Sequence, residues 1–156
     1  MGYTIYWYRE KSVDSATFEK ILHDFKKIKP ELNRNGILLA DPSGDSSPMI
    51  TSDGVGFNGL CNSQGCCEPF SFMRELIFAY REPRKRDGKY FQYVKTDGLP
   101  YGLAAAAFLI IAKNHLKDQI NVSSDNPVLM WEKPREWCQH ILGYGAEFLP
   151  ENDSVD

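Results

Sequence analysis

A chain of 156 residues with 42% hydrophobic and 25% charged residues can form one folded domain with a substantial core. Its formal net charge is −3, so the chain as a whole has no electrostatic attraction for nucleic acid or for an anionic membrane. The first residues lack the basic stretch and apolar run of a secretion signal, which favours a soluble, cytoplasmic protein. We therefore expect the four cysteines to be reduced thiols.

The first third of the chain predicts a strand and a helix. Residues 2–9 alternate tyrosines with Ile5 and Trp7, which is typical of an inner strand with two partly buried faces. A helix is predicted over residues 14–29, because apolar residues recur there at helical spacing, and Pro30 is expected to end it. These apolar residues are Phe18, Ile21, Leu22, Phe25 and Ile28.

The middle of the chain predicts short strands separated by turns. Residues 36–40 and 49–58 are strand candidates, and a loop rich in cysteine and asparagine follows them. Residues 68–80 and 90–95 are predicted to pair as a hairpin around the charged turn 81–89. The result would be a meander of three or four antiparallel strands.

The segment from 90 to 125 is the centre of the predicted fold. It indicates a strand at 90–95, a helix at 101–117 and a strand at 119–123. The helix is apolar almost all the way round, so it is expected to be buried on more than one face, and it is too short to span a membrane. A strand, a helix and a strand in succession usually form a crossover with the two strands parallel.

Together these elements predict an α+β fold. A third helix is expected over 134–142, with Gly143 as its C-terminal cap. The prediction is a mostly antiparallel sheet of four to six strands with three helices and one βαβ crossover around helix 101–117. Residues 1–146 would form a single domain, and 147–156 an acidic, frayed tail.

Polar residues gather at one edge of this predicted crossover. Parallel strands present their carboxyl ends at the same edge of a sheet, where such sheets bind ligands. The start of the central helix would add amide N–H groups that suit an anion. An ordinary turn with a solvated lysine is the favoured alternative. The candidate ligand-binding residues are Lys95, Thr96, Tyr101, Ser123, Ser124 and Asp125, with Arg74 as a phosphate or carboxylate clamp.

No cofactor, metal or catalytic motif is complete in this sequence. Gly54, Gly56 and Gly59 have the spacing of a dinucleotide-binding turn, but no helix follows them. Cys61, Cys66 and Cys67, even with Cys138, lack the paired spacing of zinc modules. We therefore expect neither a cofactor nor a metal. Catalysis stays open, since a cysteine–histidine pair or two carboxylates could meet only in the folded chain.

One stretch of the chain is strongly basic. Residues 81–89 hold most of this charge and are flanked by aromatic residues. Basic tips beside aromatic strands can bind single-stranded nucleic acid through phosphate contacts and base stacking. The favoured alternative is a solvated hairpin tip whose aromatics face the core at alternate positions, because the whole chain is acidic. Nucleic-acid binding is therefore not expected. The flanking aromatics are Phe78, Tyr80, Tyr90, Phe91 and Tyr93.

Short motifs are spread along most of the chain. They are Phe57-Asn58-Gly59, Cys67-Glu68-Pro69-Phe70 with Arg74, Lys95-Thr96 before Pro100-Tyr101, Val122-Ser123-Ser124-Asp125, and Leu142-Gly143-Tyr144-Gly145. This pattern resembles an uncharacterised family of small bacterial and fungal proteins. That family has Cys-Lys-Thr-Ala-Arg-x-Pro-Tyr-Asp where this chain has residues 94–102, so here Val94, Asp97-Gly98 and Gly102 replace a cysteine, an Ala-Arg pair and an aspartate. The resemblance implies positions of interest and no particular chemistry.

These observations favour a non-enzymatic binding or regulatory module that works through a protein partner. The alternative is a small enzyme, or a protein that binds a small anion such as phosphate at the cluster of candidate residues. A concave pocket formed by that cluster would favour the alternative, and a flat surface would favour the partner.

Overall fold

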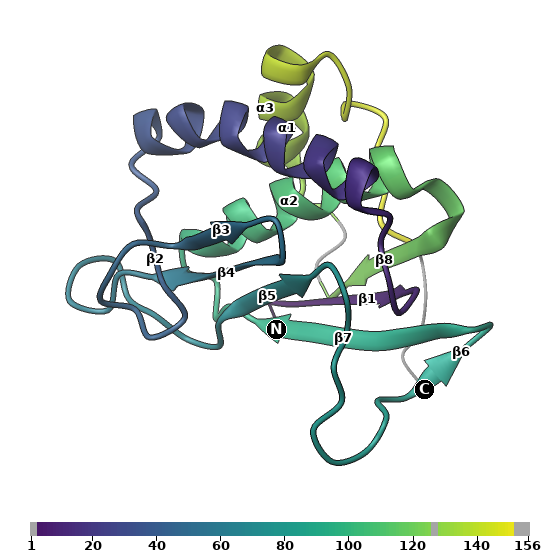
Figure 1. The fold of residues 1–156 in the computed structure, drawn as a ribbon. Coiled ribbons are helices and arrows are strands. Elements are labelled where there is room, and N and C mark those ends of the chain that lie inside the picture. The colour runs from purple at the N-terminus through teal and green to yellow at the C-terminus, as the bar shows by residue number, and fades with distance from the viewer. Residues whose placement is uncertain (1–2, 126–127, 152–156) are drawn as a thin grey trace.

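The computed structural model describes residues 3–125 and 128–151 (Figure 1). Asn126 and Pro127 of the expected turn, and residues 152–156 of the expected tail, lie outside this part. The helices are α1 (Ser15–Arg34), α2 (Tyr101–Leu116) and α3 (Glu132–Leu142), and a 3-10 turn at Lys117–Gln119 follows α2. The strands are β1 (Thr4–Arg9), β2 (Leu39–Ala40), β3 (Met49–Thr51), β4 (Gly54–Gly59), β5 (Phe70–Met73), β6 (Lys85–Arg86), β7 (Lys89–Lys95) and β8 (Ile120–Ser124).

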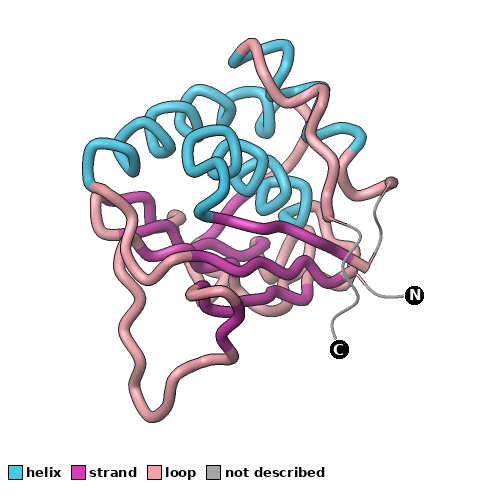
Figure 2. The backbone as a smooth tube through the Cα atoms, turned by 90° about the vertical axis from the view of Figure 1, so that its right-hand side faces the viewer, coloured by secondary structure: helices cyan, strands magenta, loops and turns pink. Residues whose placement is uncertain are grey.

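The first sheet confirms the predicted crossover. Its strand order is β6-β7-β1-β8, and β1 pairs antiparallel with both β7 and β8. The strands β7 and β8 are therefore parallel to each other, with α2 connecting them and β1 between them. The three helices lie together on one side of this sheet in two perpendicular views (Figures 1 and 2). The α+β fold class is confirmed.

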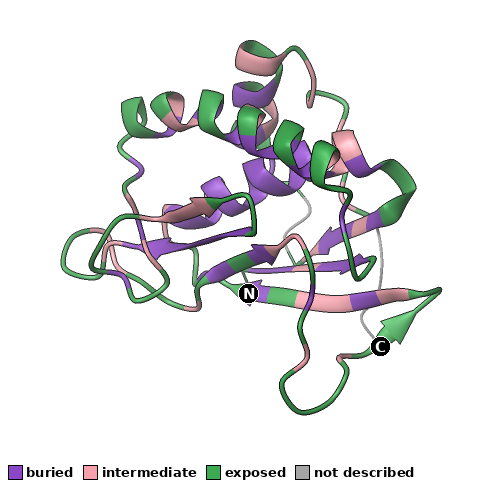
Figure 3. Cartoon of the chain, in the orientation of Figure 1, coloured by how far each residue is buried: buried purple, intermediate pink, exposed green. Residues whose placement is uncertain are grey.

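The second sheet differs from the predicted meander. Its order is β2-β4-β3, and β5 pairs with β4 rather than with β7. The strand expected at 68–80 ends at Met73, and the following residues form an exposed loop in which Ile77 is 90% and Tyr80 100% accessible (Figure 3). Instead, β5 pairs with β4 and buries Phe70 and Phe72, whereas β7 pairs with β1 on one edge and with the short β6 on the other.

Helix α1 continues past Pro30, where it was expected to end. Pro30 is exposed, so water can satisfy the carbonyl that loses its helical partner. The extra turn brings Leu32 into the core. At the other end of the helix, the Asp14 side chain accepts a hydrogen bond of 3.2 Å from the Thr17 amide, which caps the first turn.

Helix α2 is the buried centre of the molecule. Its residues 104–112 are all at most 1% accessible, as the apolar pattern predicted. Phe108 contacts the rings of Phe25, Phe70 and Phe72 at centroid distances of 5.3–5.4 Å. This aromatic cluster joins α1, α2 and the second sheet, and Trp7 connects β1 to it through Phe70.

The expectation of four reduced thiols is wrong for this structure. Cys61 and Cys66 form a disulfide, because the turn between them brings their Cα atoms to 4.7 Å. Cys67 is a free, exposed thiol, and Cys138 is free and buried.

Candidate functional site

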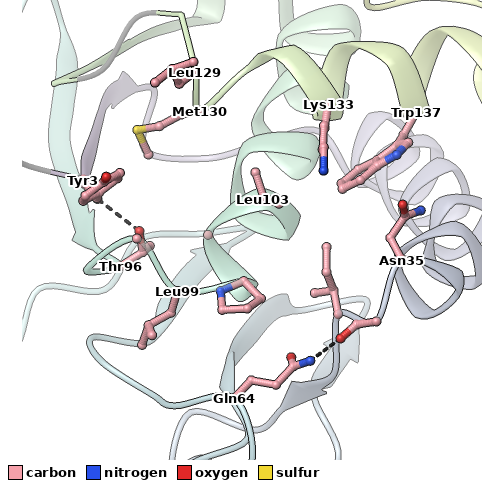
Figure 4. A pocket seen from close by; sticks show the side chains of 15 residues that line it. Tyr3, Asn35, Gln64, Thr96, Leu99, Leu103, Leu129, Met130, Lys133 and Trp137 are labelled. Carbon is pink, nitrogen blue, oxygen red and sulfur yellow. Dashed lines mark hydrogen bonds between the residues drawn. The ribbon is translucent and has the colours of Figure 1, made fainter.

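A cavity of about 450 Å³ opens beside the first turn of α2 (Figure 4). Three regions far apart in sequence build it: the end of α1, the loop before α2, and one face of α3. The described residues that line it are Tyr3, Asn35, Gly36, Ile37, Gln64, Thr96, Gly98, Leu99, Pro100, Gly102, Leu103, Leu129, Met130, Lys133 and Trp137.

The end of α1 supplies one wall. Gly36 takes a left-handed backbone conformation with φ of 77°, which ends the helix and turns Ile37 back toward it. The Ile37 amide then donates to the Leu32 carbonyl at 2.9 Å. Gln64 fixes this turn from outside, because its side chain donates to the Gly36 carbonyl and accepts a bond of 3.0 Å from the Leu38 amide.

The loop before α2 supplies the floor. The Thr96 hydroxyl donates to the Tyr3 carbonyl at 3.1 Å, which fixes the loop to the start of β1. A Cβ atom on Gly102 would lie 2.8 Å from the Thr96 hydroxyl oxygen, so this position needs glycine for close packing. The amides of Gly102 and Leu103 already donate to the carbonyls of Leu99 and Pro100. The helix N-terminus therefore offers fewer free N–H groups than expected.

Helix α3 supplies the third wall and the charge. Lys133 and Trp137 are four residues apart, so they lie on the same face, and both side chains border the cavity (Figure 4). Lys133 is the one charged side chain among the described lining residues. Within residues 3–125 and 128–151, neither its ammonium group nor the indole N–H of Trp137 has a hydrogen-bond or ion-pair partner. Most of the remaining wall is apolar.

Of the predicted ligand-binding residues, Thr96 lines this cavity and the others do not. Tyr101 is 1% accessible, and its hydroxyl donates to the backbone carbonyls of Glu68 and Lys95. Burial raises the pKa of this phenol well above its usual value. Lys95 is exposed, and its amide donates to the Glu68 carboxylate at 3.0 Å. Tyr101 thus acts as a structural anchor for the turn that precedes α2.

The ends of the two parallel strands do meet at one edge, but β1 separates them. Lys95 is opposite Thr4, and Ser124 is opposite Ile5. Ser123 is buried, Ser124 accepts a bond of 2.9 Å from the Trp131 indole, and Asp125 accepts one of 2.7 Å from the Tyr6 hydroxyl. These side chains form structural contacts and do not line the cavity.

Arg74 lies at the other end of β1. Its guanidinium donates to the Val13 carbonyl at 3.0 Å, and its own carbonyl accepts from the buried Arg9. Five residue steps along β1 separate Arg9 from Thr4, a length of about 17 Å. The structure therefore does not bring Arg74 to the other candidate residues.

A second polar cluster joins α1, α2 and the segment after α3. The Asp24 carboxylate accepts a bond of 2.6 Å from the Tyr144 hydroxyl and lies 2.8 Å from the imidazole of His115. Buried Cys138 is close enough for Asp24 to affect its pKa, but burial is the main reason that this pKa rises to about 12. A thiol with such a pKa is a poor nucleophile at neutral pH. The cluster therefore stabilises the packing of the helices.

The sequence contained little signal for the cavity. Trp137 lies in the predicted helix 134–142, but Lys133 precedes that helix, and the observed start of α3 at Glu132 places both on one helix face. Gln64, Asn35 and Tyr3 come from separate loops and ends, and only the tertiary fold brings them together.

Comparison with protein-family models, curated proteins and solved structures gives no match to this chain. In the described part of the chain, no three His, Cys, Asp or Glu residues are placed to hold a metal ion. No helix there has the length and hydropathy needed to cross a membrane.

Proposed function

We propose that the protein is a non-enzymatic binding module whose ligand is a small organic anion with an apolar body, such as a carboxylate. The observation that carries this proposal is the cavity itself, an apolar hollow in which Lys133 provides the charge. Its volume of about 450 Å³ lies in the range of small-molecule sites. The apolar body would lie between Leu103, Met130 and Trp137.

The polar groups at the cavity suit one anionic group. The Lys133 ammonium can form an ion pair with a carboxylate, and the Trp137 indole N–H can donate one further bond. A charge-assisted bond at the mouth of an apolar cavity is stronger than the same bond in open water. No lining carboxylate opposes such a ligand among the described residues.

Binding is favoured over catalysis because the reactive groups nearby already have structural roles. Tyr101 and Thr96 donate to backbone carbonyls, and the thiol of Cys138 is buried, is directed at the Ala107 carbonyl and does not line the cavity.

The test is a thermal-shift and calorimetry screen with hexanoate, octanoate and phenylacetate, beside octanol and octanamide as neutral analogues and inorganic phosphate as a bare anion. A ligand at 100 times its dissociation constant should raise the stability of the folded state by about 2.7 kcal/mol. We expect carboxylates to bind and the neutral analogues to bind at least about tenfold more weakly.

Two variants and one control assign the binding to this cavity. Lys133→Gln should remove the preference for carboxylate over amide, and Leu103→Trp should block the apolar part. Lys20→Gln removes an exposed lysine from α1 and should change nothing. Equal binding of octanoate and octanamide, or binding that survives Leu103→Trp, would overturn the proposal. Stabilisation by phosphate alone would support the predicted strand-end cluster instead.

A further inference from the structure

One face of the first sheet is turned away from the three helices (Figure 1). Strand residues alternate between the two faces of a sheet, and the register pairs Tyr6 with Tyr93 and Tyr8 with Phe91. These four side chains therefore share one face on the two central strands. We call them the aromatic face. Trp7 and Gln92, on the opposite side, form a hydrogen bond of 3.0 Å with each other.

The rings of the aromatic face are arranged as neighbouring stacks. Phe91 lies with its centroid 6.0 Å from Tyr6 and 5.8 Å from Tyr93, at interplanar angles of 25° and 28°. Tyr93 is 51% accessible, and Tyr6 and Phe91 are partly accessible. Tyr8 is 7% accessible, so Tyr6, Phe91 and Tyr93 form the accessible part of the row. Accessible apolar patches of this kind often mark interaction sites.

Cationic side chains border this face. The guanidinium of Arg84 lies 4.4 Å from the Phe91 ring centroid, and that of Arg86 lies 4.2 Å from the Tyr8 centroid. Lys95 extends from the other end of β7 on the same face, opposite Thr4. Residues 81–95 contain six basic and two acidic residues, although the whole chain has a net charge of −3. The positive charge of this acidic protein is thus concentrated beside its exposed rings.

The aromatic residues of β7 divide between the two faces of the sheet. Tyr90 faces the core and is 9% accessible, as the interpretation of a solvated hairpin tip expects at alternate positions, whereas Phe91 and Tyr93 lie on the outer face. At the β8 edge of this side, Asp125 accepts a hydrogen bond from Tyr6, and Glu151 accepts one from Asn121.

We propose that the aromatic face binds single-stranded nucleic acid, with bases stacked on Phe91 and Tyr93 and phosphates near Arg84, Arg86 and Lys95. Every base has an apolar face that can stack on an aromatic ring, so such a surface binds strands with little sequence preference. Arg84, Arg86 and Lys95 lie on or next to β6 and β7. The phosphate backbone of the nucleic acid would therefore follow these two strands, away from Asp125 at the β8 edge.

A duplex cannot use this surface equally well, because its bases are already stacked on one another. The proposal therefore predicts a preference for single strands over duplexes. It also predicts that binding weakens with added salt, since phosphate contacts release counterions.

The experiment is fluorescence anisotropy with fluorescein-labelled oligouridylate and oligothymidylate, and with a duplex of the same length, over a series of salt concentrations. We expect both single strands to bind with dissociation constants between about 1 and 100 μM at low salt. Tyr93→Ala should weaken binding by about tenfold, because it removes one stacking ring from an exposed position. Lys95→Gln should lower the slope of log K against log salt by about 0.7.

Two control variants separate this face from unspecific binding. Tyr80→Ala removes a fully exposed ring from the neighbouring loop, and Lys27→Gln removes an exposed lysine from α1. Both should bind single strands as the original protein does. Circular dichroism should show the same fold for every variant. Stronger binding of RNA than of DNA, or the reverse, would support the proposal and identify the sugar that is recognised.

Three results would overturn it. The first is no anisotropy change with either single strand at low salt. The second is equal or stronger binding of the duplex. The third is binding that Tyr93→Ala and Lys95→Gln leave unchanged, which would place the nucleic acid elsewhere on the protein.

Discussion

The side-chain amide of Gln64 donates a hydrogen bond to the backbone carbonyl of Gly36, and so fixes the loop closed by the Cys61–Cys66 disulfide to the end of α1. Gln64 also receives a bond from the Leu38 amide. The two bonds hold one wall of the cavity in place. The shape of that wall therefore depends on a loop whose two ends are joined by a bond that a thiol reductant can break.

Opening this disulfide should lower stability. Closing a loop of about six residues reduces the entropy of the unfolded chain and stabilises the folded state by about 2 kcal/mol. A Cys61→Ser/Cys66→Ser double variant should therefore melt about 4–8 °C lower than the original protein. Differential scanning calorimetry measures this, and Cys67→Ser, which removes an exposed free thiol, is the matched control.

A thiol reductant gives a second test of this disulfide. Disulfides persist mainly in oxidising surroundings, so a cytoplasmic protein would keep this bond open for much of the time. A thiol count shows whether dithiothreitol has opened the bond. If the bond is open and the melting temperature is unchanged, the disulfide contributes nothing to stability.

The elements of the fold that carry strong local patterns were predictable. The buried helix α2 shows an apolar sequence on all sides, and Gly143 has the left-handed conformation of a helix cap. The division of the strands into two sheets was not predictable, because the sequence alone does not say with which strands β7 pairs. One of its partners, β1, is more than eighty residues away in the chain. Such a choice depends on the burial of Trp7 and Ile5 and not on any local signal.

The candidate site was less predictable from local sequence patterns than the fold. The sequence identified the strand ends and the start of α2, and the structure brings these together at one edge. However, most of the polar side chains predicted there bond to the backbone or to nearby rings, and Thr96 is the one that reaches the cavity. Lys133, which provides the charge, was not among the predicted site residues, because nothing near it in sequence indicates a cavity.

The cysteines should differ sharply in reactivity. Exposed Cys67 should react with a thiol reagent such as Ellman's reagent in the native protein. Burial raises the pKa of Cys138 to about 12, so only about one molecule in ten thousand carries its thiolate at pH 8. We expect one fast-reacting thiol in the native protein, two in urea, and four after reduction. Three or more fast thiols without reductant would contradict the disulfide.

The packing at Gly102 should tolerate no side chain. A methyl group there would lie 2.8 Å from the Thr96 hydroxyl oxygen and 3.1 Å from its Cβ atom, so the loop before α2 would have to move. Gly102→Ala should therefore lower the free energy of unfolding by about 1–3 kcal/mol, although alanine is the better helix former. Chemical denaturation measures this. A Gly102→Ala/Thr96→Ala double variant, which removes the hydroxyl oxygen that lies 2.8 Å from the added methyl group, should lose less stability than the sum of the two single variants.

The buried side chain of Arg9 holds the C-terminal end of β1 in place. Its side chain is 0% accessible, and its guanidinium donates to the carbonyls of Glu10, Met73 and Arg74 while lying 4.3 Å from the centroid of the Phe72 ring. Burial lowers its pKa to about 10. No carboxylate balances its charge among the described residues, so the carbonyl groups must do so.

Replacing Arg9 with methionine should cost about 3 kcal/mol of unfolding free energy, because the carbonyls of Met73 and Arg74 lose their donors in a site that water does not reach. Arg9→Lys keeps the charge, but one ammonium group cannot reach carbonyls on both sides, so it should recover less than half of that loss. Urea denaturation followed by Trp fluorescence measures both. The control is Arg34→Met, since the Arg34 side chain is 62% accessible and its ion pair with Glu31 should contribute less than about 1 kcal/mol. Equal stability of Arg9→Lys and the original protein would show that charge alone, without the geometry of the guanidinium group, stabilises this end of the sheet.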